Sequence, residues 1–173
     1  MRFLLDGMLG RLTRWLRMIG CEAKYAKNGS DADLIREARE NSLILLTCDV
    51  QLYRAAIARN VECFLIQGTN ESERLANLAA RFNIQLDIAT ERSRCPACGE
   101  VIKPVNKDEI APRIPTATFK LYQSFWICSN TSCAKIYWQG SHWKRIEKTL
   151  ENARIILENK QHEHREKSTI PIS

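Results

Sequence analysis

Short apolar runs alternate with helix-like patterns over about the first 85 residues, and this alternation limits the possible folds more than any other feature of the chain. Residues 2–6 and 43–47 are mostly apolar, as expected of strands that are buried on both faces. Residues 9–19 repeat apolar side chains every three or four positions, which predicts a helix. Strands that alternate with helices form right-handed βαβ units and a mostly parallel sheet. The sequence therefore predicts an α/β domain.

The same patterns continue along the chain. They predict further strands at 22–25 and 61–66, and further helices at 31–40, 50–59, 70–82 and 141–160. The rhythm stops at 83–93, which we interpret as a linker, and the polar end at 162–173 is expected to be loose. We therefore expect three parts: an α/β domain at 1–85, a small module at 94–145, and a C-terminal helix and tail at 146–173.

Charge is distributed unevenly along the 173 residues. The net charge is +6, of which residues 1–90 contribute +1 and residues 91–173 contribute +5. The second half is therefore the expected surface for an anionic partner, although a modest positive charge also favours solubility alone. No apolar stretch is long enough to span a bilayer, and an acid at position 6 interrupts any signal-peptide pattern. A cytoplasmic protein without a membrane partner is expected.

Three acids occupy comparable places in the alternating pattern. Asp6 ends the first apolar run, Asp49 follows the run at 43–47, and Asp31 begins a predicted helix. In a parallel sheet these positions share one edge, which is where open α/β sheets bind ligands. Carboxylates suit Mg²⁺ or Mn²⁺, and such ions support phosphodiester chemistry. Asp33 is an accessory candidate, because it does not share a helix face with Asp31.

Each acid also has a structural interpretation. Asp31 and Asp49 are reasonable helix caps, and capping alone would explain their residue type. An acid that ends a buried strand gains nothing from burial, so Asp6 would need a partner such as a salt bridge to Arg11, Arg14 or Arg17. Those three arginines could instead contact an RNA backbone or form a solvated helix face.

Four cysteines form two pairs, Cys95/Cys98 and Cys128/Cys133, separated by 29 residues. Four thiolates at these spacings predict a structural, tetrahedral Zn²⁺ site, and His142 is not needed as a ligand. A redox pair or a surface disulfide is the alternative. The remaining cysteines, Cys21, Cys48 and Cys63, lie beside apolar runs and are expected to be buried, reduced thiols.

Aromatic residues concentrate around the second cysteine pair. Seven of the 13 aromatics lie between positions 119 and 143, with basic residues among them, including Lys135, Lys144 and Arg145. Such a surface could stack bases and hold phosphates. A small zinc module also has a thin core that aromatics fill, so we expect most of them to be packed and one or two to be free.

Several motifs together resemble the Mut7-C RNase domain, a branch of the PIN-like nucleases. They are FLLDGMLGRLTRWLRMIG at 3–20, SDADLIREA at 30–38, LLTCD at 45–49, the cysteine module and YWQGSHW at 137–143. The resemblance implies a PIN-like three-layer domain with a zinc ribbon, and metal-dependent RNA cleavage with ions bound at Asp6, Asp31 and Asp49. Two departures stand out: Cys48 replaces a basic residue that is common before the third acid, and no fourth acid can be assigned.

The predicted function is thus a ribonuclease that uses Mg²⁺ or Mn²⁺ and carries a structural Zn²⁺. Its RNA contacts are predicted at Arg11, Arg14, Arg17, Lys135, Lys144 and Arg145. Three alternatives remain: a non-catalytic adaptor that binds RNA, the ribosome or another RNA-processing protein; the toxin of a toxin–antitoxin pair; and a nuclease that acts on DNA. The sequence leaves the oligomeric state open.

Overall fold

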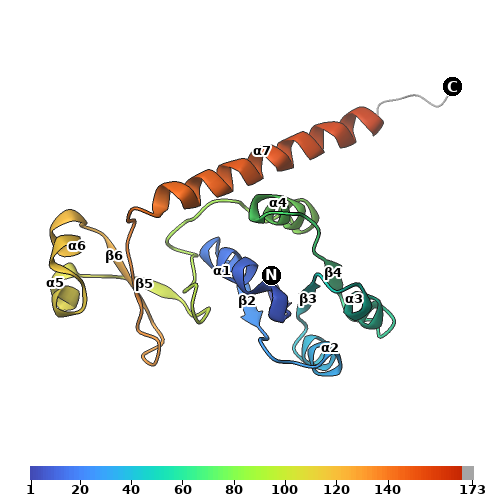
Figure 1. The fold of residues 1–173 in the computed structure, drawn as a ribbon, viewed down its shortest axis with the longest axis horizontal. Coiled ribbons are helices and arrows are strands. Elements are labelled where there is room, and N and C mark those ends of the chain that lie inside the picture. The colour runs from blue at the N-terminus through green and yellow to red at the C-terminus, as the bar shows by residue number, and fades with distance from the viewer. Residues whose placement is uncertain (169–173) are drawn as a thin grey trace. The chain divides into compact units, whose positions relative to one another are not determined.

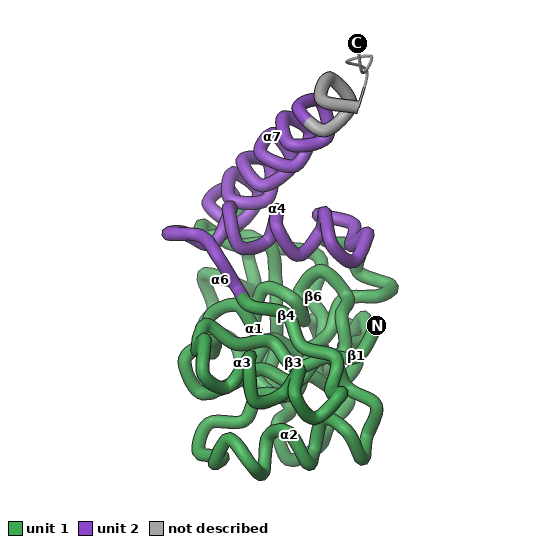
Figure 2. The backbone as a smooth tube through the Cα atoms, turned by 90° about the vertical axis from the view of Figure 1, so that its right-hand side faces the viewer, with its two compact units in different colours: residues 1–65, 88–143 green, residues 66–87, 144–173 purple. Residues whose placement is uncertain are grey.

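The computed structural model describes residues 1–168 and divides into two compact units (Figure 2). Unit 1 comprises residues 1–65 and 88–143, and unit 2 comprises residues 66–87 with the chain from 144 onward. The predicted domain ranges stay a prediction.

A four-stranded parallel sheet forms the centre of the larger part of unit 1 (Figure 1). Its strands are β1 (Arg2–Leu5), β2 (Glu22–Tyr25), β3 (Ile44–Thr47) and β4 (Cys63–Leu65), in the order β2-β1-β3-β4. All three strand pairs are parallel. The prediction of an α/β domain with a parallel sheet is confirmed.

The crossover helices of this sheet cover both of its faces. After a short 3₁₀ turn, η1 (Gly7–Leu9), come α1 (Gly10–Met18), α2 (Asp31–Glu40) and α3 (Val50–Ile57). From β1 to β2 the chain moves across the sheet in one direction, and from β2 to β3 and then β4 it moves in the other direction. Right-handed crossovers therefore place α1 on one face of the sheet and α2 and α3 on the opposite face. On the α2/α3 side, Leu4 and Leu45 lie opposite each other and pack with Leu34, Ile35, Ala38, Leu52 and Ala56.

A second, antiparallel sheet forms the rest of unit 1. It joins β5 (Ile102–Val105), β6 (Phe125–Cys128) and β7 (Ile136–Tyr137), in that order. The expected small module with its four cysteines is therefore present, and this part of the fold prediction is confirmed.

The stretch between β5 and β6, for which no helix was predicted, contains α5 (Lys107–Ile110), the 3₁₀ turn η2 (Ala111–Arg113) and α6 (Thr116–Leu121). Asn106 caps α5 by accepting a hydrogen bond from the Asp108 amide at 3.1 Å. The segment is held because Ile110 and Ile114 are buried with Phe125. These contacts are distant in sequence, so periodicity could not indicate them.

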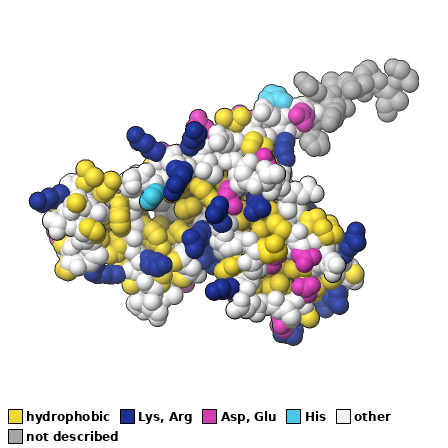
Figure 3. All heavy atoms as spheres, viewed as in Figure 1, with side chains coloured by type: hydrophobic (Ala, Val, Ile, Leu, Met, Phe, Trp, Pro, Cys, Tyr) yellow, Lys and Arg dark blue, Asp and Glu magenta, His cyan; other side chains and the backbone are white. Residues whose placement is uncertain are grey.

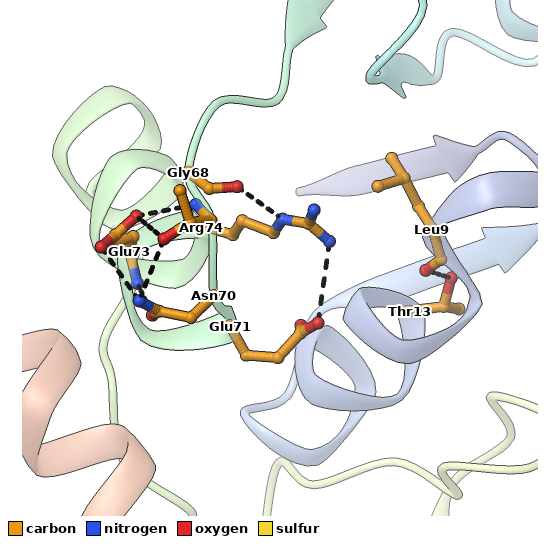
Figure 4. Close-up of polar contacts among 8 residues, drawn as sticks. Leu9, Thr13, Gly68, Asn70, Glu71, Glu73 and Arg74 are labelled. Carbon is orange, nitrogen blue, oxygen red and sulfur yellow. Dashed lines mark hydrogen bonds and ion pairs between the residues drawn. The ribbon is translucent and has the colours of Figure 1, made fainter.

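Unit 2 contains α4 (Glu71–Phe82) and α7 (Trp143–Ser168), which begins at the last residue of unit 1. Figure 4 shows the start of α4, where the Asn70 side chain accepts from the Glu73 amide at 3.0 Å and donates to the Glu73 carboxylate at 2.9 Å. The Ser72 hydroxyl donates to the Thr149 carbonyl at 2.9 Å, and Arg154 donates to the Leu86 carbonyl at 2.9 Å. These bonds join α7 to the α4 segment.

Helix α7 is longer than the predicted 141–160 and continues through Ser168. The expected loose end is thus wrong for residues 162–168, where strong helix formers such as Glu, Lys and Arg follow one another. Residues 169–173 lie outside the described part. None of the helices within residues 1–168 combines the length and the apolar character that crossing a membrane requires.

The core of the parallel sheet gives a direct test of the fold. Leu45 is fully buried at 0 % exposure, whereas Ile57 at the end of α3 is 47 % exposed. We expect Leu45→Ala to lower the free energy of unfolding by about 2–5 kcal/mol, because it leaves a cavity. Ile57→Ala should lower it by less than about 0.5 kcal/mol. Urea unfolding of both variants measures this, and equal losses would contradict the assigned core.

Candidate functional site

The parallel sheet brings three acids to one edge, which we call the acidic edge (Asp6, Asp31 and Asp49). Asp6 directly follows the central strand β1, and Asp49 lies two residues after the neighbouring strand β3. Asp31 begins α2, which follows β2 on the other side of β1. Because these strands are parallel, the three acids follow strand ends that share the same side of the sheet.

Asp6 is buried, with 5 % exposure. One carboxylate oxygen, Oδ1, accepts a hydrogen bond from the Met8 amide at 2.9 Å, and Oδ2 accepts one from the Thr47 hydroxyl. In the described part of the chain no ion pair joins Asp6 to the arginines of α1, so the salt-bridge alternative does not explain this acid. Its negative charge is therefore stabilised by two neutral donors.

Thr47 connects two of the acids and was missed by the sequence reasoning. Its side chain is fully buried, and its hydroxyl oxygen donates to Asp6 and accepts from the Asp49 amide at 2.8 Å. Asp49 is exposed and caps α3, since its Oδ1 accepts from the amides of Gln51 at 2.6 Å and Leu52 at 3.2 Å. The only sequence signal for Thr47 is a polar residue that ends an apolar strand.

Asp31 and Asp33 differ in their surroundings. Ser30 caps α2, and its hydroxyl lies 2.6 Å from Asp33 Oδ2, while Arg36 donates to Asp33 Oδ1 at 2.5 Å. The Ser30 bond, followed by that of Arg36, lowers the pKa of the Asp33 carboxyl. Within residues 1–168 the exposed Asp31 carboxylate has no hydrogen bond or ion pair, so capping does not account for it.

The oxygen donors of the acidic edge suit hard cations such as Mg²⁺ and Mn²⁺, which keep several waters and need few carboxylates. The three acids are more widely spaced than a preformed ligand cluster. In the described chain, the candidate metal ligands that do lie close together are four cysteines, Cys95, Cys98, Cys128 and Cys133. Their sulfur atoms all lie within 4.8 Å of one another.

The four cysteine sulfurs fit a zinc ion. Cys95 Sγ lies 3.8 Å from Cys133 Sγ, and Cys98 Sγ lies 3.4 Å from Cys128 Sγ. Tetrahedral zinc with bonds of about 2.3 Å places its sulfurs about 3.8 Å apart. All seven cysteines are free thiols, so the disulfide alternative is not realised. The four-cysteine cluster thus fits the predicted structural Zn²⁺.

Neighbouring groups prepare one of these thiols for metal binding. The Tyr137 hydroxyl lies 3.0 Å from Cys95 Sγ. Burial opposes ionisation of Cys95, but hydrogen bonds from Tyr137 and from the backbone amides of Cys98 and Ala97 outweigh it and lower the pKa of the Cys95 thiol to about 6. Zinc binds the thiolate form, so such outer contacts support the ligand set.

Arg17 joins the two sheets of unit 1. It is 7 % exposed, and its Nε donates to the Ala23 carbonyl at 2.8 Å. Its Nη1 donates to the carbonyls of Pro96 at 3.2 Å and Ala97 at 2.9 Å, in the cysteine knuckle (residues 95–99). Gly99 has φ +86°, and a Cβ there would lie 2.9 Å from Arg17 Nε. Arg17 therefore fixes the cysteine knuckle against α1.

The other predicted RNA contacts fall into two groups. Arg11, Arg14 and Lys135 are exposed and line a pocket of about 830 Å³ in unit 1, together with Arg17. Lys144 and Arg145 are exposed in the first turn of α7, and neither of them lines that pocket.

The aromatic residues of the small module contribute mainly to its core. Phe125 is buried, and its ring centroid lies 6.2 Å from that of Trp138. Phe119, Tyr122 and Trp138 pack against the cluster of Phe125, Ile110 and Ile114. Each of the seven aromatics between positions 119 and 143 is at least partly buried, so none of them is fully free.

The isolated cysteines are poor nucleophiles. Burial raises the pKa of the Cys21 thiol, and it raises that of Cys63 to about 12. Both are therefore protonated at neutral pH, in keeping with reduced, structural thiols. Cys48 is partly buried beside Asp49.

Zinc content tests the cysteine cluster. Protein purified without added metal should contain about one zinc per chain. Cys128→Ser should lose most of that zinc and unfold more readily, because a structural zinc contributes directly to folding. Cys63→Ser, outside the cluster, serves as the control and should keep its zinc. Elemental analysis of both variants decides, and full zinc retention by Cys128→Ser would contradict the assigned ligands.

Comparison with known proteins agrees with this architecture. Residues 1–150 match the family model described as the Mut7-C RNAse domain. Searches of curated proteins and of solved structures gave no match. The matched range includes the acidic edge, Arg17 and all four clustered cysteines. Since the family model covers most of its length, this chain belongs to the Mut7-C RNase domain family.

Proposed function

We propose that this chain hydrolyses RNA phosphodiester bonds at the acidic edge, with Mg²⁺ or Mn²⁺ bound by Asp6, Asp31 and Asp49. Membership of an RNase domain family implies ribonuclease activity and an RNA substrate. The observation that carries the site assignment is the burial of Asp6 at the end of the central strand, with neutral donors only. A buried carboxylate without a cationic partner attracts a metal cation.

Each residue of the proposed site has a distinct part. Asp6 would supply a fixed ligand, because its carboxylate is held by Met8 and Thr47. Asp49 would supply a second carboxylate from the start of α3, and Asp31 would supply a third, which has no hydrogen bond or ion pair within residues 1–168. The bound ions would activate water and neutralise the charge of the leaving oxygen. Asp33 supports the start of α2 through Ser30.

A non-catalytic RNA-binding adaptor is the second candidate. It is favoured by the spacing of the acids, which form no tight ligand cluster in the described chain. The toxin and the DNA nuclease use the same proposed chemistry and differ in partner or substrate. Matched RNA and DNA oligonucleotides would separate the DNA nuclease from the ribonuclease.

Cleavage of a mixed pool of structured and single-stranded RNA in Mn²⁺ tests the proposed site. Asp6→Asn, Asp31→Asn and Asp49→Asn should each reduce the cleavage rate by more than about 100-fold. Losing a metal ligand should cost more activity than losing a hydrogen-bond partner of a ligand. Glu40→Gln, an exposed acid at the far end of α2, should cleave at the wild-type rate. Equal rates for all four variants would rule out the acidic edge, and no cleavage by zinc-loaded wild type would favour the adaptor.

Thr47 should act as a positioning residue. Thr47→Val removes the donor to Asp6 and the acceptor of the Asp49 amide while keeping a similar shape. We expect Mn²⁺ affinity and cleavage to fall by roughly 10–100-fold. Unfolding free energy should fall by about 1–3 kcal/mol, because buried polar groups lose their partner.

Thr47→Ser is the matched control, since it keeps the hydroxyl. It should restore Mn²⁺ affinity even where the missing methyl group lowers stability. If Thr47→Ser lost metal affinity as Thr47→Val does, the hydroxyl would not be the cause, and the proposed link between the two acids would fail.

A further inference from the structure

A pocket of about 830 Å³ lies between α1 and the cysteine knuckle, wholly within unit 1. We call it the basic pocket. Helix α1 forms one wall, the end of β2 and the residues after it form a second, and the cysteine knuckle and β7 complete it. The lining residues that matter here are Arg11, Arg14, Arg17, Lys27, Lys135 and the two tyrosines Tyr25 and Tyr137.

The positive charge of the basic pocket is not compensated. Five of its lining residues are basic, and none of the described residues that line it is acidic. The side chains of Arg11, Arg14, Lys27 and Lys135 take part in no ion pair or hydrogen bond within residues 1–168. Elsewhere in unit 1, Arg2, Lys24 and Arg36 are paired with acids. Converging unpaired cations in a concave surface attract a polyanion.

The basic pocket adjoins the acidic edge through a short, fixed connection. The Tyr25 hydroxyl donates to the carbonyl of Gly7, the residue after Asp6, at 2.9 Å. A Cβ on Gly7 would lie 2.8 Å from the Lys27 carbonyl, so the chain that leaves Asp6 is pressed against the chain that leaves β2. An extended anion in the pocket would therefore lead toward Asp6.

These observations favour a single-stranded nucleic acid over an acidic peptide. Tyr25 and Tyr137 place aromatic rings among the cations, which is the combination that binds unpaired bases and their phosphates. The positions of the rings are fixed, because their hydroxyls bond Gly7 and Cys95 respectively. Figure 3, in the same view as Figure 1, shows dark blue Lys and Arg side chains on the surface between the part that holds β5 and β6, at the left, and the part that holds β3 and β4, at the right.

We propose that the basic pocket binds the single-stranded RNA backbone next to the scissile phosphate, so that the cysteine knuckle forms a wall of the substrate site. This inference rests on the proposed function. It gives the zinc site a second role, since Arg17 ties the knuckle to α1 and Cys95 of the knuckle bonds the hydroxyl of Tyr137, which lies two residues after Lys135. Lys27, which the sequence patterns did not single out, becomes an RNA contact.

RNA binding by the full chain tests the proposal. The probe is a fluorescein-labelled 12-nucleotide single-stranded RNA, measured by anisotropy without added Mg²⁺ or Mn²⁺ and over a range of salt concentrations. Lys27→Ala/Lys135→Ala should weaken binding about tenfold and reduce the salt slope by roughly 1.4, or about 0.7 for each lost phosphate contact. The control, Lys103→Ala/Lys120→Ala, removes two exposed lysines that do not line the pocket.

The control pair should change RNA affinity less than twofold, with zinc content and thermal unfolding unchanged in both pairs. Equal losses in the two pairs would show general attraction to positive charge and overturn the pocket. An acidic peptide that displaces the RNA at equal concentration would assign the pocket to protein docking instead.

Cleavage in Mn²⁺ is measured separately on the same proteins. Pocket-dependent RNA binding without cleavage by wild type would contradict the proposed function while leaving the pocket assigned to RNA. Wild-type cleavage that the pocket pair retains in full, at RNA concentrations below saturation, would contradict the pocket assignment alone.

Discussion

The buried guanidinium of Arg17 is the contact on which the arrangement of unit 1 depends. It donates to one carbonyl in β2 and to two in the cysteine knuckle, and only a residue without a side chain fits at Gly99 beside it. Burial lowers the pKa of this guanidinium, whereas the charges of the nearby Cys98 and Cys95 act to raise it. Removing it would leave the carbonyls of Ala23, Pro96 and Ala97 with one partner fewer, and this loss is costly at the buried Ala23. This contact holds the knuckle and its cysteines against α1, and the knuckle in turn forms one wall of the basic pocket.

The acidic edge shows a complementary arrangement. Asp6 is buried and forms no ion pair within residues 1–168, and the neutral hydroxyl of Thr47 supports it and also accepts from the Asp49 amide. Negative charge is thereby concentrated at the strand ends, while positive charge that is unpaired within residues 1–168 is concentrated along α1 and just before β7. A phosphodiester needs both: cations along its backbone for binding and carboxylate-bound metal at the bond that breaks.

Local patterns predicted the elements best where they repeat. The strand at 22–25 and the helix at 31–40 were predicted with their observed bounds, because apolar periodicity is a local signal. The helices between β5 and β6 were missed, since they are held by contacts with Phe125. Arg17 was predicted as one of three similar arginines of α1, and no local pattern distinguishes it as the buried one. Thr47 was missed because Asp6, the acid that its hydroxyl supports, lies 41 residues earlier in the chain.

The sequence by itself determined the alternating sheet-forming pattern, the cysteine spacing and the order of the acids along the chain. Each of these depends on residue type and separation, which set periodicity and ligand chemistry. Only the tertiary structure decided which arginine is buried, which hydroxyl supports Asp6, and which four basic side chains converge without partners. Those features arise where segments far apart in sequence meet, as in the contact of α1 with the cysteine knuckle 80 residues later. Burial and hydrogen-bond partners at such places are properties of the packed chain.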